Sequence, residues 1–262
     1  AARNDNLPIV QYLIKNNPSL TLQNNKNGST AIHYAAVGGS APVIEALIQA
    51  GLDFDARTSD GTHVLHIAAR SDNLPIVQYF IKNNPSLTLQ NDEDGWTAIH
   101  FAAAGGSAPV IEALIQAGLD LNARTNDGAH VLHIAAWKDN LPIVKYLIEN
   151  NPSLTLQNDE DGCTAIHYAA AGGSAPVIEA LIQAGLDLDA RTNDGAHVLH
   201  IAARNDNLPI VQYLIKNNPS LTLQNDKNGS TAIHYAAIGG SAPVIEALIQ
   251  AGLDLDARTN DG

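Results

Sequence analysis

The chain has 262 residues, a formal net charge of −13 at pH 7 and a single cysteine, Cys163. Nucleic-acid phosphates and anionic membrane surfaces repel a chain this acidic, so we expect neither as a partner and favour a protein partner of cationic character. One cysteine excludes an internal disulfide framework and, with no leader visible at the start, favours an intracellular, cytoplasmic location. No apolar run approaches the roughly 20 residues that a membrane-spanning helix needs.

One phrase occurs four times, as GSTAIHYAAVGG from Gly28, GWTAIHFAAAGG from Gly95, GCTAIHYAAAGG from Gly162 and GSTAIHYAAIGG from Gly229. Successive copies lie 67 residues apart, and a weaker copy begins inside each interval, as in GTHVLHIAARSDNLPIVQYFI from Gly61. The period is therefore 33 residues followed by 34, which indicates an array of stacked repeats. Because the chain starts and stops inside a repeat, we expect it to be a window on a longer array.

We distinguish two kinds of repeat by the sequence of the first helix, TAIH or VLHI. The TAIH repeats are predicted over residues 28–60, 95–127, 162–194 and 229–262, the last without a C-terminal cap. The VLHI repeats are predicted over residues 61–94, 128–161 and 195–228, and residues 1–27 form a partial repeat. Each unit is expected to contact mainly its neighbours.

The first helix of a TAIH repeat is predicted from Thr30, where TAIHYAAV provides barely two turns. A helix this short is unstable alone, so neighbouring repeats must hold it. Its Ala35 and Ala36 are expected to be small for close packing.

The second helix is predicted from near Ser40, a good N-cap residue, with Pro42 in the first turn. Its Val43, Ile44, Leu47 and Ile48 form one apolar stripe, so one face is expected to be buried. Gly51 is predicted to end it as a left-handed C-cap, while VLHI repeats use Asn83 and Asn84 followed by Pro85. The segments LDFDARTSDG and SLTLQNDEDG alternate apolar and polar residues and finish in turn residues, which predicts an extended, hairpin-like finger.

The stretch GSTAIHYAAVGGSAPVIEALIQAGLDFDA resembles the ankyrin repeat, whose pattern reads Gly-x-Thr-Pro-Leu-His-x-Ala, and seven complete copies cover the chain. The resemblance implies an all-α solenoid of stacked helix pairs, with projecting loops and a concave, protein-binding surface, and it implies no cofactor. It also implies a structural role for His33 and its counterparts, which would bond the finger backbone to the helix. Ala31 departs from the family's proline. In the VLHI repeats His63, His130 and His197 replace its threonine, which is expected to alter hydrogen bonding at the start of the first helix.

The units disagree at a few positions that face the groove in proteins that this one resembles. These are the position after the turn glycine, the two residues before that glycine, and the two positions after the Ala-Ala pair. The partner-binding residues predicted there are Arg70, Glu93, Asp94, Trp96, Trp137, Lys138, Glu160, Asp161, Cys163 and Arg204. The alternative is neutral drift, because most surface substitutions change stability by less than about 0.5 kcal/mol.

The two tryptophans, Trp96 and Trp137, fall at such positions in adjacent repeats. Stacked helices lie about 8 to 10 Å apart, so both are candidates for one patch with a charged rim from Lys138 and from Glu93 and Asp94. Tryptophan is enriched among residues that dominate interface energy. In the alternative interpretation both rings lie over the apolar surface of a neighbouring repeat.

Other chemistry is disfavoured. Histidine pairs such as His63 and His66 lie three residues apart and face one side of a helix, but no third metal ligand is evident. The tip sequence NDEDG, from Asn91 and Asn158, matches only a fragment of a calcium-binding loop. Cys163 has no cationic neighbour in sequence to activate its thiol. We therefore predict no metal site, no cofactor and no enzyme.

Two function classes remain. The first is a scaffold that binds a partner protein in the concave groove. The second is a structural filament in which chains associate end to end, or a very long superhelical array, which near-identical units would build with regular curvature.

Overall fold

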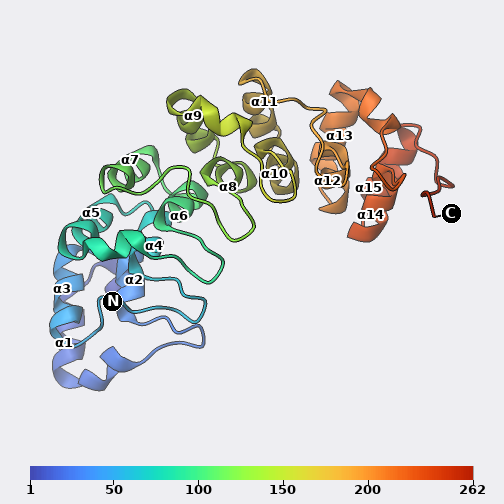
Figure 1. The fold of residues 1–262 in the computed structure, drawn as a ribbon. Helices are drawn as coiled ribbons and strands as arrows, with labels where there is room; N and C mark the ends of the chain where they lie inside the picture. Colours follow the sequence, from blue (N-terminus) through green and yellow to red (C-terminus); the bar gives the residue numbers. More distant parts are fainter. Residues whose placement is uncertain (262) are drawn as a thin grey trace. The chain divides into compact units, whose positions relative to one another are not determined.

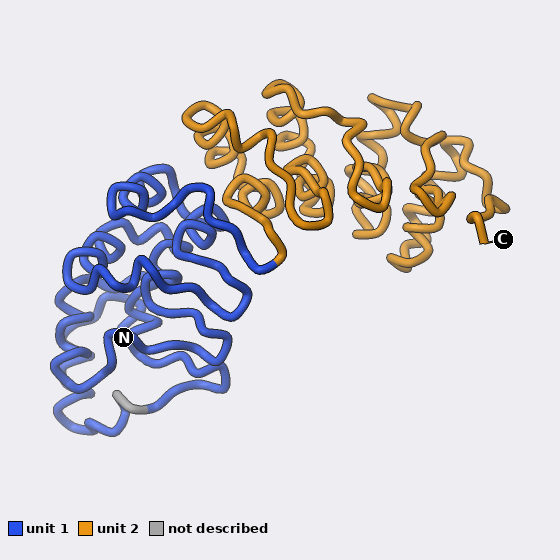
Figure 2. The backbone as a smooth tube through the Cα atoms, in the orientation of Figure 1, with its two compact units in different colours: residues 1–126 blue, residues 127–262 orange. Residues whose placement is uncertain are grey.

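The computed structural model describes residues 1–261, without the side chains of residues 21 and 22, and divides into two compact units. Unit 1 spans Ala1–Asn126 and unit 2 spans Asp127–Gly262 (Figure 2). The described part of the chain contains fifteen α-helices and five short 3-10 helices, and no strand. The predicted all-α class is therefore confirmed.

Helices follow one another as pairs joined by loops (Figure 1). The TAIH pairs are α2 (Ala31–Gly38) and α3 (Ala41–Gln49), α6 (Ala98–Gly105) and α7 (Ala108–Gln116), α10 (Ala165–Gly172) and α11 (Ala175–Gln183), and α14 (Ala232–Gly239) and α15 (Ala242–Gln250). The VLHI pairs are α4 (Val64–Arg70) and α5 (Leu74–Asn83), α8 (Val131–Trp137) and α9 (Leu141–Asn150), and α12 (Val198–Arg204) and α13 (Leu208–Asn217). The partial repeat holds η1 (Ala2–Asn4) and α1 (Leu7–Asn16). We keep the repeat boundaries given above as a proposal.

The first helices begin with a capping box. In α2 the Thr30 backbone N–H donates to His33 Nδ1 at 3.1 Å, and His33 Nε2 lies 3.1 Å from the Ala56 carbonyl of the following finger. The same arrangement recurs with His100 and Ala123 at 3.0 Å. The expected structural role of this histidine is thus confirmed, since one ring satisfies the helix start and holds the loop.

The second helices match their predicted signals. Helix α3 begins after Ser40 with Pro42 in its first turn, and it buries Val43, Ile44 and Leu47. Gly51 follows with φ of +94°, as a left-handed stop requires. In α5 the helix also stops at Asn83, but the next residue, Asn84, has a negative φ of −144°, so this end does not use a left-handed residue.

The extended-finger prediction is wrong for part of each VLHI repeat. The SLTL letters lie in 3-10 helices: η3 (Pro85–Leu89), η4 (Pro152–Leu156) and η5 (Pro219–Leu223), with η2 (Pro18–Leu22) in the partial repeat. Pro85 fixes the first φ, and the Thr88 hydroxyl donates to the Pro85 carbonyl at 2.7 Å, so local bonds favour the turn. Leu87 is still buried, while Leu89 is 84% exposed. Within the described residues, the fingers make only isolated bridges, Arg57 with His63 and Asn91 with Thr97.

Polar side chains link one repeat to the next inside each unit. Asn73 Nδ2 donates to the Gly39 carbonyl at 3.2 Å, and the Ser107 hydroxyl donates to the Asp72 carboxylate. In unit 2, Ser174 donates to Asp139 in the same way. Asp72 holds a left-handed φ of +56°, which aspartate tolerates better than most residues. No helix in the described part of the chain is long and apolar enough to span a bilayer.

Candidate interaction surface

Glycines at the ends of the TAIH first helices fix the residues that follow the Ala-Ala pair in VLHI repeats. A Cβ on Gly105 would lie 2.6 Å from the Arg70 carbonyl oxygen. The corresponding distance is 2.1 Å from Gly172 to Trp137 and 2.3 Å from Gly239 to Arg204. The backbone of these residues is therefore pressed against the next helix, which leaves only their side chains free to vary.

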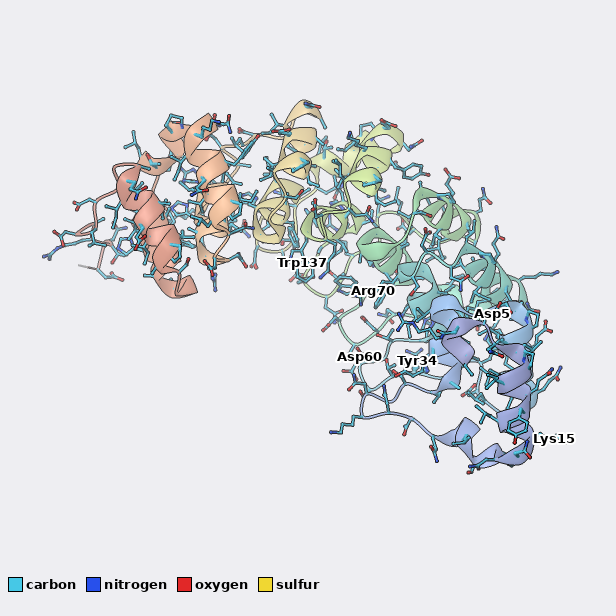
Figure 3. All side chains as sticks on the ribbon, turned by 180° about the vertical axis from the view of Figure 1, so that it is seen from behind. Asp5, Lys15, Tyr34, Asp60, Arg70 and Trp137 are labelled. Atoms are coloured by element: carbon cyan, nitrogen blue, oxygen red, sulfur yellow. The ribbon has the colours of Figure 1, made fainter. Side chains whose placement is uncertain are left out.

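Those side chains face outward. Arg70 and Arg204 are exposed, and Trp137 is 40% exposed. In unit 1, Tyr34, Asp60 and Arg70 lie on the side from which the loops project, whereas Lys15 lies among the outer helices (Figure 3). We call the loop-side face of each unit, made of finger tips and first-helix ends, its inner surface.

The finger tips within a unit are joined by backbone atoms. In unit 1, the Glu93 N–H donates to the Asp60 carbonyl at 3.1 Å and the Asn126 N–H donates to the Asp94 carbonyl at 2.9 Å. In unit 2, the Glu160 N–H donates to the Asp127 carbonyl at 3.2 Å. Because these bonds use no side-chain atom of the two tip residues, those residues can be substituted while the backbone of the tip keeps its position.

Each acidic tip is also braced by an internal aspartate. Asp92 Oδ1 accepts from the N–H groups of Asp94 and Trp96 at 3.0 and 2.8 Å. Asp159 does the same for Asp161 and Cys163, at 3.0 and 2.7 Å. The side chains of Glu93, Asp94, Glu160 and Asp161 remain exposed. The tips are thus ordered turns that present carboxylates to solvent.

Trp96 lies over the first helix of its own repeat. Its ring centroid is 5.4 Å from Phe101, with an interplanar angle of 64°, and 6.2 Å from His100. The indole is half-buried. The contact is an edge-to-face pair of the kind that stabilises aromatic clusters.

The phenylalanine beneath Trp96 replaces a tyrosine of the other TAIH repeats. Tyr168 and Tyr235 donate their hydroxyls to Asp159 and Asp226 at 2.8 and 2.9 Å. Burial acts to raise the pKa of Asp226, but hydrogen bonds from the Ser230 backbone and the Tyr235 hydroxyl hold it below the usual value. For Asp92, which has no such tyrosine, burial leaves the pKa raised. In the repeat of Trp96 and Phe101, an aromatic contact thus replaces the tyrosine–aspartate hydrogen bond of the other repeats.

We expect the substitutions at positions 96 and 101 to be coupled. Trp96→Ser alone should lower the free energy of unfolding by about 1 kcal/mol, because Phe101 loses its aromatic neighbour. Adding Phe101→Tyr should restore most of that loss by rebuilding the Ser230 and Tyr235 arrangement. Urea unfolding of the two single variants and the double variant measures this, and additive effects would contradict the coupling.

Trp137 makes a different contact. Lys138 Nζ lies 3.4 Å from the Trp137 ring centroid, a cation–π geometry that orients the indole at the end of α8. Trp96 belongs to unit 1 and Trp137 to unit 2. Their common patch stays a hypothesis.

Cys163 is unsuited to nucleophilic chemistry. Burial, together with the neighbouring Asp159 and Asp161 carboxylates, raises the pKa of its thiol to about 12. The reactive thiolate form is therefore scarce at neutral pH. The side chain is half-buried at the base of a finger tip.

The paired histidines lie against each other as tilted rings inside the solenoid. His63 and His66 have ring centroids 3.7 Å apart, and His63 Nδ1 accepts from the Leu65 N–H at 3.3 Å. This bond confirms that histidine at the cap position changes the hydrogen bonding at the helix start. Among the residues that the structure describes, no group of three or more His, Cys, Asp or Glu side chains is placed to hold a metal ion.

Comparison with known proteins agrees with this architecture. A family model described as "Ankyrin repeats (3 copies)" matches residues 1–91, 65–158, 151–225 and 199–262. The chain is 32% identical over 260 residues to "Poly [ADP-ribose] polymerase tankyrase" of Caenorhabditis elegans, which covers 90% of the chain and 11% of that relative. It is 30% identical over 193 residues to "Palmitoyltransferase AKR1" of Lachancea kluyveri (71% and 26%), and 29% identical over 188 residues to "Nuclear factor NF-kappa-B p105 subunit" of Gallus gallus (68% and 19%).

The chain thus spans about a quarter or less of the length of these relatives. Two of them are named as enzymes, but nothing in the described residues points to catalysis here. What the matches share with this chain is the repeat sequence itself. Because the family model matches from the first residue to the last, the chain belongs to the ankyrin-repeat family.

Proposed function

We propose that the chain is a non-catalytic scaffold whose inner surface binds a partner protein. The observation that carries this proposal is that, in each repeat, one set of atoms holds the stack together and another set of side chains varies. Backbone atoms join the finger tips and glycines fix the first-helix ends, so the stack depends little on the side chains at those positions, although Lys227 Nζ adds a bond to the Asn193 carbonyl at 2.6 Å. These are the positions at which the repeats differ, which is expected where side chains are selected for a partner.

We infer that the partner presents cationic side chains to the finger tips. Glu93 and Asp94 in unit 1, and Glu160 and Asp161 in unit 2, are exposed carboxylates on ordered turns. Fixed charges of one sign attract a complementary partner and speed its association. The net charge of −13 acts in the same direction.

The test uses peptides selected from a random dodecapeptide display library on the whole chain. We expect the selected peptides to carry lysine or arginine, and their affinity to fall about tenfold on a variant with Glu93→Lys, Asp94→Asn, Glu160→Lys and Asp161→Asn, as the loss of charge pairs predicts. The new tips copy Lys227 and Asn228, which the fold already accepts. Equal binding to both proteins would contradict the proposal.

End-to-end stacking is the second candidate, and the near-identity of the repeats favours it. Identical repeats would continue with the same geometry from one copy of the chain to the next. Light scattering distinguishes the two: a mass that rises with concentration supports stacking, and a constant monomer mass contradicts it.

A further inference from the structure

We propose that the inner surface of unit 2 binds an extended segment of the partner protein in which an acidic side chain pairs with Arg204 and an apolar side chain contacts Trp137. This inference rests on the proposed function and specifies the chemistry of the partner. The partner segment then carries an anionic side chain that faces the first-helix ends and cationic side chains that face the finger tips. Its two edges therefore bear opposite charges.

The floor of this surface is a row of first helices. Helices α8, α10 and α12 pack consecutively within unit 2 (Figure 1). The residues after the Ala-Ala pair in these helices are Trp137, Ala171 and Arg204. Consecutive helices lie about 8 to 10 Å apart, so Trp137 and Arg204, two steps apart, are separated by about 16 to 20 Å.

Arg204 supplies the charge that selects an acidic side chain. It is exposed, and its guanidinium makes no hydrogen bond or ion pair with the described residues of the chain. Arg204 acts electrostatically on the Tyr235 hydroxyl: burial and Asp226 raise the pKa of that hydroxyl to about 12, and Arg204 opposes the rise. A guanidinium with five N–H donors is well matched to a carboxylate, which it can hold through two parallel bonds.

Trp137 supplies the apolar contact. Gly172 fixes its backbone, and Lys138 over one face of the indole holds the ring while 40% of the residue stays exposed. An oriented, partly exposed tryptophan is a typical anchor for an apolar side chain. Ala171 lies between the two contacts, and its small side chain leaves room for an extended peptide to cross the surface.

The separation sets a sequence spacing. An extended chain advances about 3.3 Å per residue, so about 16 to 20 Å corresponds to five or six residues. Unit 1 differs in this respect, because Arg70 occupies the position of Arg204 but the other first-helix ends there carry Val37 and Ala104 and no tryptophan. Unit 1 therefore has the cation without the apolar anchor.

The experiment sequences the dodecapeptides selected on the whole chain and measures their affinities by fluorescence anisotropy. We expect peptides with an aspartate or glutamate five or six positions from an aromatic or aliphatic residue. Their affinity should fall at least tenfold on Arg204→Gln and on Trp137→Ala, and should not change on Lys145→Gln, because Lys145 lies on the second helix α9, outside the inner surface. Ala171→Ile, which copies the residue at position 238, should also weaken binding, because the larger side chain occupies space that the peptide needs.

A charge exchange gives the sharpest test. Arg204→Glu should abolish binding of the acidic peptides, and replacing their acidic residue by lysine should restore it. Peptides that lack the acidic residue, or that bind equally to Arg204→Gln while losing affinity on the tip variant, would overturn this inference and leave the proposed function standing. Peptides insensitive to every inner-surface variant, or a library that yields none, would overturn both.

Discussion

Between pH 7 and pH 5, the free energy of unfolding is expected to fall by about 2 kcal/mol for each buried histidine that stays neutral in the fold. Burial lowers the pKa of His167 and of His200 to about 4, against opposing contributions from hydrogen bonds and carboxylates. Burial likewise lowers the pKa values of the adjacent pair His63 and His66 and of His197. Several such groups together amount to much of the stability of an ordinary domain.

The direction follows from proton binding. An unfolded histidine has a pKa of about 6.5, so below that pH the unfolded chain binds protons that the folded chain does not bind. The stability is therefore complete above pH 6.5 and is lost as the pH falls toward the folded pKa values. At His63 the nearby His66 and Arg57 add to the effect of burial, and its Nε2 atom is buried with no hydrogen-bond partner in the described residues.

The measurement is urea unfolding at pH 7, 6 and 5, with a variant that the chain itself suggests. Thr30 caps the first helix of a TAIH repeat, so His63→Thr combined with His197→Thr keeps a capping residue at both VLHI positions. The loss between pH 7 and pH 5 should shrink by about 2 kcal/mol for each histidine removed. An unchanged pH dependence would mean that these histidines are protonated inside the folded chain.

Local signals in the sequence were sufficient for the helix pairs. Ser40, Pro42 and Gly51 act on the backbone beside them, so the start and stop of α3 are encoded within one repeat. The 3-10 turn η3 was missed because Leu87 is buried in it just as it would be in a strand, and alternation alone does not separate the two. The better signal was Pro85 with Thr88, whose hydrogen bond closes the turn.

The candidate site was less accessible from sequence, because its geometry depends on neighbouring repeats. Comparison of the repeats picked out Trp96 as variable, but only the structure shows it resting on Phe101. The two substitutions occur in the same repeat, a coincidence that marks a contact once it is noticed. The reason why Gly172 stands after a variable residue is a carbonyl of the preceding repeat, which no single-repeat pattern contains.

Replacing that glycine should have the second large effect. In Gly172→Ala the new Cβ would lie 2.1 Å from the Trp137 carbonyl oxygen and 2.8 Å from its carbonyl carbon, so α8 and α10 must separate. Both obstructing atoms belong to the backbone, and no side-chain rotation relieves the clash. We expect a loss of about 3 kcal/mol in the free energy of unfolding, at the upper end of the cost of overpacking, measured by urea unfolding.

Gly185→Ala is the matched control, since it adds the same methyl group within the same repeat. No atom lies within 4 Å of its Cβ position, but its φ of +93° strains an alanine, so we expect a smaller loss of about 1 to 2 kcal/mol. The two variants should also differ in the peptide assay, because only the first displaces the backbone of Trp137. If both lose equal stability and both still bind the selected peptides, then α8 and α10 adjust to the methyl group freely, and the glycine does not hold Trp137 in place.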